Sequence, residues 1–271
     1  MNKQNLPAGQ IPKEPAQSTS TPPHNGLLQV QGVTKVFGGL TAVDHVTFSI
    51  EKGQILGLIG PNGAGKSTIV AMIMGVYKPN AGDILFHGES LVHFKPNQVV
   101  ERGIARTFQV EKPLLNMTVT GNVLIGALLR TPGRKEALEQ VKKIIERVRL
   151  GHVAHSLAKN LTVQDRKRLE LARALATCPE VLLLDEVMAG LTPMEIDQSL
   201  DLLRQLRDEG LAILVIEHVM RAIMNISDRV VVLDYGKKIA EGEPRKISQD
   251  PLVVEAYLGR RGTRSGVPAN S

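Results

Sequence analysis

A glycine-rich segment that follows a short apolar run restricts the fold of this chain more than any other feature. Residues 60–68, Gly-Pro-Asn-Gly-Ala-Gly-Lys-Ser-Thr, fit the spacing G-x-x-x-x-G-K-[ST], and residues 55–59 read as a buried strand. Backbone N–H groups of such a loop turn toward a triphosphate, Lys66 reaches its outer phosphates, and the Ser67 hydroxyl is placed for Mg²⁺. A helix from about 65 to 74 adds its positive dipole end. The segment predicts a phosphate-binding loop, and a glycine turn that binds nothing is the alternative.

The loop supplies most of the predicted nucleotide-binding residues. They are Gly60, Pro61, Asn62, Gly63, Ala64, Gly65, Lys66, Ser67 and Thr68.

Length and composition set the class of protein. The 271 residues suffice for one α/β domain with an insertion or for two small domains. We find no apolar run of about 18 residues or more that could span a bilayer, and the N-terminus lacks the apolar region of an export signal. The single cysteine, Cys178, excludes an internal disulfide framework and fits a reducing cytosol. We expect it to be a small packed residue.

The formal charge of +6 is compatible with nucleic acid, an anionic membrane surface or a polyphosphate ligand. Basic residues cluster at 166–168 and at Arg260, Arg261 and Arg264. Aromatic residues make up only 3% of the chain and tryptophan is absent, so the stacking platform of single-strand binders is missing. We therefore expect solvated helix faces and a basic tail, and no nucleic-acid partner.

The chain divides into two tails and one α/β domain. Residues 1–26 are rich in Pro, Gln, Ser and Thr, which predicts a disordered N-terminal tail. The domain is expected over 27–259, and 260–271 form a flexible C-terminal tail. Alternating apolar residues between Leu28 and Ile50 predict an antiparallel β layer before the loop.

The rest of the domain alternates helices and strands around a helical insertion. Leu138, Val141, Ile145 and Val148 recur at helical spacing, so a helical subdomain is expected over about 112–176. It is followed by a strand at 181–184, a helix near 193–207, a strand at 213–216 and a hairpin from 230. The fold class is an α/β P-loop NTPase core with a mostly parallel sheet, an antiparallel β subdomain and a helical insertion.

Two carboxylates follow the strand at 181–184. They lie at the carboxyl edge of a parallel sheet, where ligands of such sheets collect. Asp185 would orient Mg²⁺ or its water shell, and Glu186 would polarise the attacking water as a general base. The strand at 213–216 ends in Glu217-His218, and the His218 imidazole could contact the γ-phosphate. An exposed acidic pair and a structural histidine are the alternatives.

Six segments occur in the order 37–40, 60–68, 106–109, 182–186, 189–191 and 216–218, and the domain ends in Ala-Tyr-Leu-Gly at 256–259. Together these segments resemble an ABC-transporter ATP-binding subunit over about 27–259. Phe-Gly-Gly-Leu, Arg-Thr-Phe-Gln, the Ala-Gly-Leu turn and the ending Ala-Tyr-Leu-Gly are similar to the branched-chain amino acid importer cassettes.

The resemblance implies roles that chemistry alone leaves open. Phe37 would stack on adenine, unless it is a core residue, and Gln109 would sit beside Mg²⁺ and the attacking water. Leu191 would lie in a loop that crosses to a partner cassette, and residues 111–119 would face the coupling helix of a transmembrane permease. The expected cofactors are ATP and Mg²⁺, with metal contacts from Ser67, Gln109 and Asp185.

The chain departs from the family at its signature. Leu-Ser-Gly-Gly-Gln aligns with Leu161, Thr162, Val163, Gln164 and Asp165, so both glycines are replaced. Val163 and Gln164 would crowd the approach to a partner's γ-phosphate, which glycine permits. Thr162 and Asp165 still form an S/T-x-x-acid capping pattern. Repulsion of Asp165 by phosphate would be offset by the cap or by Arg166 and Lys167. Val187 replaces the proline that usually follows the acidic pair.

The main hypothesis is a cytoplasmic ATPase subunit, attached peripherally to the inner face of the membrane, that powers an importer for branched-chain or related amino acids. Its expected partners are a second cassette of different sequence, permease subunits and, indirectly, a solute-binding protein. A weakly hydrolysing structural or regulatory cassette is the second hypothesis. A soluble ABC-type ATPase that acts on nucleic acid or ribosomes is the third.

Overall fold

The computed structural model describes residues 26–107, 113–131, 133–217 and 220–258. The strands are β1 (Leu28–Phe37), β2 (Leu40–Ile50), β3 (Ile55–Ile59), β4 (Ala81–Phe86), β5 (Glu89–Ser90), β6 (Ile104–Arg106), β7 (Val181–Asp185), β8 (Ala212–Ile216), β9 (Arg229–Asp234) and β10 (Lys237–Gly242). The α-helices are α1 (Lys66–Ile73), α2 (Pro96–Arg102), α3 (Val119–Ala127), α4 (Arg134–Arg147), α5 (Val163–Ala176), α6 (Pro193–Asp208), α7 (Met220–Ile226), α8 (Pro244–Ile247) and α9 (Pro251–Leu258). The predicted 1–26 tail, except Gly26, and the 260–271 tail lie outside the described residues.

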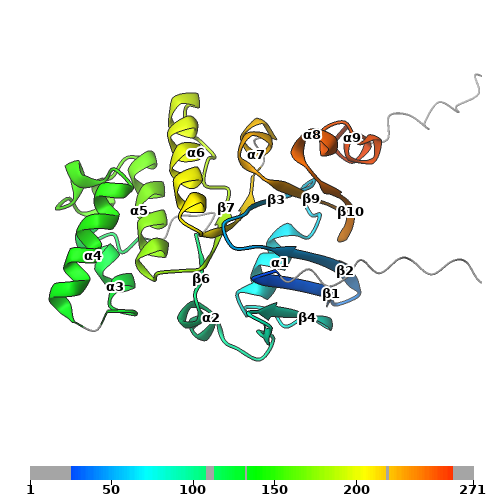
Figure 1. Cartoon of the computed structure of the whole chain (residues 1–271), viewed down its shortest axis with the longest axis horizontal. Helices are drawn as coiled ribbons and strands as arrows, with labels where there is room; N and C mark the ends of the chain where they lie inside the picture. The colour runs from blue at the N-terminus through cyan, green and yellow to red at the C-terminus, as the bar shows by residue number, and fades with distance from the viewer. Residues whose placement is uncertain (1–25, 108–112, 132, 218–219, 259–271) are drawn as a thin grey trace, which may run out of the picture.

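The strands form two sheets, as expected. The larger sheet has the order β10-β9-β3-β8-β7-β6, and only β10 runs antiparallel to its neighbour. The smaller sheet has the order β2-β1-β4-β5 and is antiparallel throughout. Helix α1 lies beside the two sheets, and α6 and α7 lie on the opposite side of the larger sheet (Figure 1). The predicted P-loop NTPase core with an antiparallel β subdomain is confirmed.

The core is built from strands that are apolar on both sides. All five residues of β3, β7 and β8 are buried, as expected for strands covered on two faces. One apolar cluster joins residues of the two sheets with α1, and a second joins the other face of the larger sheet with α6 and α7. Burial of these strands fixes the positions of the residues that follow them.

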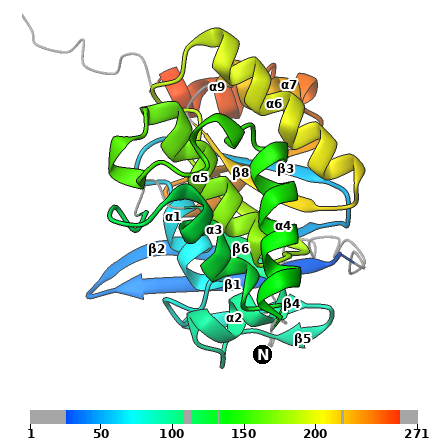
Figure 2. The ribbon, with the colours of Figure 1, turned by 90° about the vertical axis from the view of Figure 1, so that its left-hand side faces the viewer.

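A helical subdomain of α3, α4 and α5 projects from the side of β6 and β7 (Figures 1 and 2). It has its own apolar cluster, which includes Val123, Val141 and Leu169. The periodicity predicted α4 correctly, but Leu138 is 39% exposed and Ala137 is buried in its place. Among the described residues, no helix is both long and apolar enough to cross a membrane.

The expectation for Cys178 is wrong. Its side chain is exposed and accepts a hydrogen bond from Gln140 Nε2 at 2.9 Å. The residue lies in the turn between α5 and β7 with φ of 49°, a left-handed conformation that carries the chain out of the helix. The turn therefore presents the thiol at the surface, where the sequence led us to expect a packed residue.

Candidate functional site: a phosphate loop facing a strand-end carboxylate

The phosphate loop connects β3 to α1 and depends on backbone that only glycine provides easily. Gly60, Gly63 and Gly65 have φ values of 151°, 80° and 101°. A Cβ atom on Gly60 would lie 2.2 Å from the carbonyl oxygen of Leu233, and one on Gly65 would lie 2.6 Å from that of Ala42. Two of the glycines are therefore required by close backbone contacts as well as by conformation.

Lys66 is the first residue of α1 and is buried, with 7% of its surface exposed. Its Nζ atom donates hydrogen bonds to the carbonyl oxygens of Gly60, at 2.7 Å, and Pro61, at 2.9 Å. Burial lowers the pKa of Lys66 below its usual value, and the charges of Glu186 and Asp185 partly offset this effect. The ammonium group therefore lies within electrostatic reach of both carboxylates.

An open depression joins the loop to the end of β7. Lys66, Ser67, Thr68 and Glu186 line it together with Ala42 and residues 62–65. Residue Ser67 is exposed there, while Thr68 is partly buried. The structure thus brings loop residues 62–68 and the predicted general base to one surface, whereas Gly60 and Pro61 are not among the residues that line it.

Asp185 is nearly inaccessible at the end of β7, with 3% of its surface exposed. Its Oδ2 atom accepts a hydrogen bond from Arg106 Nη2 at 2.7 Å, and its backbone N–H donates to the Thr107 hydroxyl at 3.4 Å. The sequence placed Arg106 in a segment that resembles the family, but it did not predict this ion pair with Asp185. Its pairing with Asp185 depends on β6 lying beside β7.

Glu186 turns sharply away from the strand. Its φ of 52° is unusual for a residue other than glycine, and strained conformations of this kind cluster at functional sites. Its backbone N–H donates to the carbonyl of Ile216 at 2.9 Å, and its own carbonyl accepts from Lys167 Nζ at 3.3 Å. Contacts to β8 and to α5 therefore fix the backbone of the predicted base.

Glu217 is a site residue whose role the sequence did not reveal. It follows β8, is 2% exposed, and accepts a hydrogen bond from the Met188 backbone N–H at 2.7 Å. This contact ties the end of β8 to the turn after Glu186. In the sequence, its position directly after the apolar strand residues is the signal that could have identified it.

Two predicted catalytic residues cannot be placed. Gln109 and His218 both lie outside the described residues, so their proposed contacts stay predictions.

Phe37 ends β1 and is 39% exposed. Its ring packs edge-on against Tyr77, with centroids 5.1 Å apart at 76°, and Lys35 Nζ lies 5.2 Å from its centroid. Phe37 is therefore not a core residue, and its stacking on adenine stays a prediction.

The altered signature segment caps α5 as the sequence predicted. The Thr162 hydroxyl accepts a hydrogen bond from the Asp165 backbone N–H at 3.1 Å and donates to Asp165 Oδ2 at 2.9 Å. Arg166 Nε donates to the Leu161 carbonyl at 3.2 Å, so the compensation expected from Arg166 and Lys167 stays a prediction beside the observed cap. The His152 imidazole lies 3.6 Å from the Asp165 carboxylate, and the Arg168 guanidinium lies 3.9 Å from it.

The substituted glycine positions differ in their surroundings. Val163 is 55% exposed. The Gln164 amide fits between α5 and α6 when its nitrogen donates to Glu195 Oε1, at 3.2 Å, and its oxygen accepts from Arg168 Nη2, at 3.0 Å. Gln164 therefore links the start of α5 to α6, a contact that glycine could not make.

The donor set fits Mg²⁺, which prefers oxygen ligands and keeps several waters. The Ser67 hydroxyl is exposed in the depression, and the Asp185 charge offsets part of the lowering of the Lys66 pKa that burial causes. No group of three or more His, Cys, Asp or Glu side chains suited to a metal occurs in the described part of the chain. A metal here would accordingly depend on nucleotide and water oxygens for most of its ligands.

A phosphate loop on a central parallel strand, facing carboxylates at the end of a second strand, defines a P-loop nucleoside triphosphatase. Residues 43–189 match the family model described as ABC transporter, and residues 237–263 match the model described as branched-chain amino acid ATP-binding cassette transporter. The chain belongs to the family of ABC-transporter ATP-binding cassettes, which are ATPases.

The sequence similarity to known relatives extends over nearly the full length of those relatives. The chain is 40% identical over 249 residues to the high-affinity branched-chain amino acid transport ATP-binding protein LivG of Escherichia coli K12, covering 86% of this chain and 98% of the relative. It is 37% identical to BraF of Pseudomonas aeruginosa, with the same coverage. The crystal structure of the ADP conformation of MJ1267, an ATP-binding cassette of an ABC transporter, has a TM-score of 0.78 at 33% identity, covering 86% of this chain and 98% of that one.

Proposed function

We propose that this chain is the ATP-hydrolysing subunit of an importer for branched-chain or related amino acids, attached to the cytoplasmic face of the membrane. The names of LivG and BraF support the solute class, as does the second family model. The observation that carries hydrolysis is the depression that Lys66, Ser67 and Glu186 line together.

Each residue has a proposed role in that depression. Lys66 and the loop amides bind the phosphates, and the ring of Phe37 stacks on adenine. Ser67, Asp185 and Gln109 hold Mg²⁺, which neutralises charge on the phosphates when bound. Glu186 accepts a proton from the attacking water, and His218 contacts the γ-phosphate.

A second cassette is proposed to complete the site. Among the described residues, those of the signature segment, 161–165, do not line the depression that contains Lys66. The N-terminus of α5 is therefore proposed to act on nucleotide held by another chain, through the Thr162 hydroxyl and free backbone amides. The loop with Leu191 lies next to this helix across a cavity and would cross to the same partner.

The helical subdomain offers a surface for a permease. Within residues 113–131 it exposes Leu114, Leu115, Met117, Ile125, Leu128 and Leu129. Exposed apolar side chains gathered in a short segment are typical of a protein contact. Residues 111 and 112 of the predicted contact segment lie outside the described part.

Purification of the tagged full chain from detergent-solubilised membranes tests the assembly. We expect a permease and a second cassette to co-purify, and the complex to hydrolyse ATP. Substitution Glu186→Gln should lower turnover by about a hundredfold or more, the scale of general-base loss, while ATP binding persists. Recovery of ribosomes or DNA without a membrane protein would contradict the proposal.

A weakly hydrolysing structural or regulatory cassette, paired with a more active partner, is the second candidate, a hypothesis raised by the replacement of both signature glycines. The two candidates differ in which site is active. If Glu186→Gln leaves turnover of the complex unchanged, whereas the same substitution at the matching glutamate of the partner cassette abolishes it, the regulatory role is supported.

A further inference from the structure

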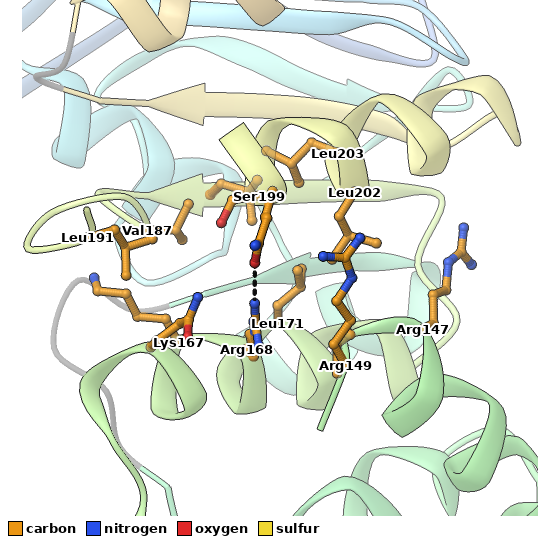
Figure 3. Close-up of a pocket in the computed structure, with 14 residues that line it drawn as sticks. Arg147, Arg149, Lys167, Arg168, Leu171, Val187, Leu191, Ser199, Leu202 and Leu203 are labelled. Carbon is orange, nitrogen blue, oxygen red and sulfur yellow. Dashed lines mark hydrogen bonds between the residues drawn. The ribbon is translucent and has the colours of Figure 1, made fainter. Parts of the chain in front are cut away.

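A second cavity lies between the helical subdomain and the core, away from the phosphate loop. One wall comes from the end of α4 and from α5, and the other comes from the turn after β7 and from α6 (Figure 3). It shares no described lining residue with the depression around Lys66. The sequence led us to expect residues 166–168 on a solvated helix face, but all three are partly buried, and Lys167 and Arg168 line this cavity.

The residues that line the cavity are apolar, neutral polar or cationic. Leu171, Leu184, Leu202 and Leu203 supply apolar surface, and the neutral polar groups are Gln164, Gln198 and Ser199. The cationic groups are Arg147, Arg149, Lys167 and Arg168. No Asp or Glu occurs among the described residues that line the cavity. This chemistry complements an anion that carries an apolar tail.

Arg149 is the cation most available to a ligand. Its side chain is exposed and makes no hydrogen bond or ion pair with another described residue, whereas its backbone N–H donates to the Glu146 carbonyl at 3.0 Å. By contrast, Arg168 donates to Gln198 Oε1 at 2.9 Å, and Arg147 pairs with Glu209. The Arg149 side chain extends across the cavity toward α6 (Figure 3).

We propose that this cavity binds a small organic carboxylate with an apolar tail. The carboxylate pairs with the Arg149 guanidinium, and the tail lies against Leu171, Leu202 and Leu203. An ammonium group next to the carboxylate would find no Asp or Glu among the described lining residues, and the arginine and lysine side chains of the lining would repel it. The site therefore selects simple carboxylates over zwitterionic amino acids.

The cavity is connected to the proposed general base. Lys167 Nζ donates to the Glu186 carbonyl at 3.3 Å, and Val187, the next residue, lines the cavity. A bound carboxylate would lie between α5 and α6, next to the turn that contains Val187. It would thereby restrain the helical subdomain and the turn after Glu186 in one orientation, which lowers the rate of hydrolysis. This regulatory step depends on the proposed function, whereas binding does not.

Calorimetric titration of the full chain tests binding. The probes are 4-methylpentanoate, its neutral isostere 4-methylpentanamide, and leucine as the zwitterion. Since a hydrogen bond to a charged group contributes about 1.5–3 kcal/mol, we expect the carboxylate to bind at least about tenfold more tightly than either control. Equal binding of the amide, or no binding of the carboxylate at millimolar concentration, would overturn the proposal.

Substitutions locate the site. Arg149→Gln should weaken carboxylate binding about tenfold, and Arg149→Lys should weaken it less, because lysine keeps the charge but loses the planar donor geometry. Arg134→Gln removes the same charge from the start of α4, outside the cavity, and should have no effect. Equal losses in the Arg134 and Arg149 variants would show a general charge effect and would reject the site. Thermal unfolding verifies that each variant is folded.

ATPase assays of the assembled complex test regulation. The carboxylate should lower turnover of the unsubstituted complex and leave the Arg149→Gln complex unaffected. If titration detects the site but turnover does not change, the regulatory step is rejected. A complex without ATPase activity in the absence of the probe would contradict the proposed function instead, and the titration would still decide the binding.

Discussion

The Nη2 atom of Arg106 lies 2.7 Å from Oδ2 of Asp185, at the ends of two neighbouring parallel strands. The Asp185 side chain is 3% exposed and that of Arg106 is 16% exposed, so the pair is largely removed from water. A carboxylate that has lost its solvent depends on its remaining partners for charge compensation. The pair therefore has a structural role beside any role of Asp185 toward a metal.

Substitution Arg106→Gln should destabilise the fold by about 3 kcal/mol, because it leaves Asp185 buried without its paired charge. Urea unfolding of the nucleotide-free chain measures the change. Arg204→Gln is the control, since its pair with Asp201 is 38% and 64% exposed. That control should lose less than about 1 kcal/mol, as exposed ion pairs do. Similar losses in the two variants would contradict the importance of burial.

Gly60 and Gly63 should differ in their tolerance of alanine. Both have positive φ, so both substitutions introduce backbone strain of about 1–2 kcal/mol. Only Gly60→Ala also places a Cβ atom 2.2 Å from the Leu233 carbonyl oxygen, whereas no atom lies within 4 Å of a Cβ at Gly63. We expect Gly60→Ala to lower the thermal midpoint more and to abolish nucleotide binding. A smaller stability loss at Gly60 than at Gly63 would refute the close approach.

Lys66→Ala should remove the stabilisation that ATP gives the chain without unfolding it. A ligand present at 100 times its Kd stabilises a folded protein by about 2.7 kcal/mol, which a thermal shift detects readily. In the variant, the shift with ATP and Mg²⁺ should disappear. Lys143→Ala, an exposed position on α4, should keep the full shift. Persistence of the shift in Lys66→Ala would show that nucleotide binds elsewhere.

Thr162→Ala should cost about 1 kcal/mol, the usual effect of removing an N-cap hydroxyl. The loss has a second cause here, because the same hydroxyl donates to the buried Asp165 carboxylate. Thr162→Ser keeps both contacts and should restore most of the stability. Chemical unfolding of the three proteins measures the effect. If the serine variant is as unstable as the alanine variant, the threonine methyl group and not the hydroxyl stabilises the segment.

Local chemistry explains why the phosphate loop could be predicted from the sequence. Its function requires residue types at fixed spacing, and the apolar strand that precedes it is recognised by its composition. The cap at Thr162 and Asp165 was predicted for the same reason, since both partners lie within one turn. These features depend on neighbours in the chain and need no knowledge of the tertiary fold.

Contacts between distant segments could not be predicted in this way. Arg106 and Asp185 are 79 residues apart, and they meet because β6 adds to the sheet beside β7. The basic residues at 166–168 were assigned to a solvated face, since periodicity does not show that α6 packs nearby. Cys178 was expected to be packed because the sequence does not reveal the left-handed turn that exposes it.

The strand order has one consequence for the chemistry. Strand β8 separates β3, which ends in the phosphate loop, from β7, which ends in the acidic pair. Adjacent strands lie about 4.8 Å apart, so β3 and β7 are separated by about 10 Å. That width accommodates a terminal phosphoryl group and one water molecule in line. The width of β8 therefore sets the distance between a phosphate bound at the end of β3 and the carboxylates at the end of β7.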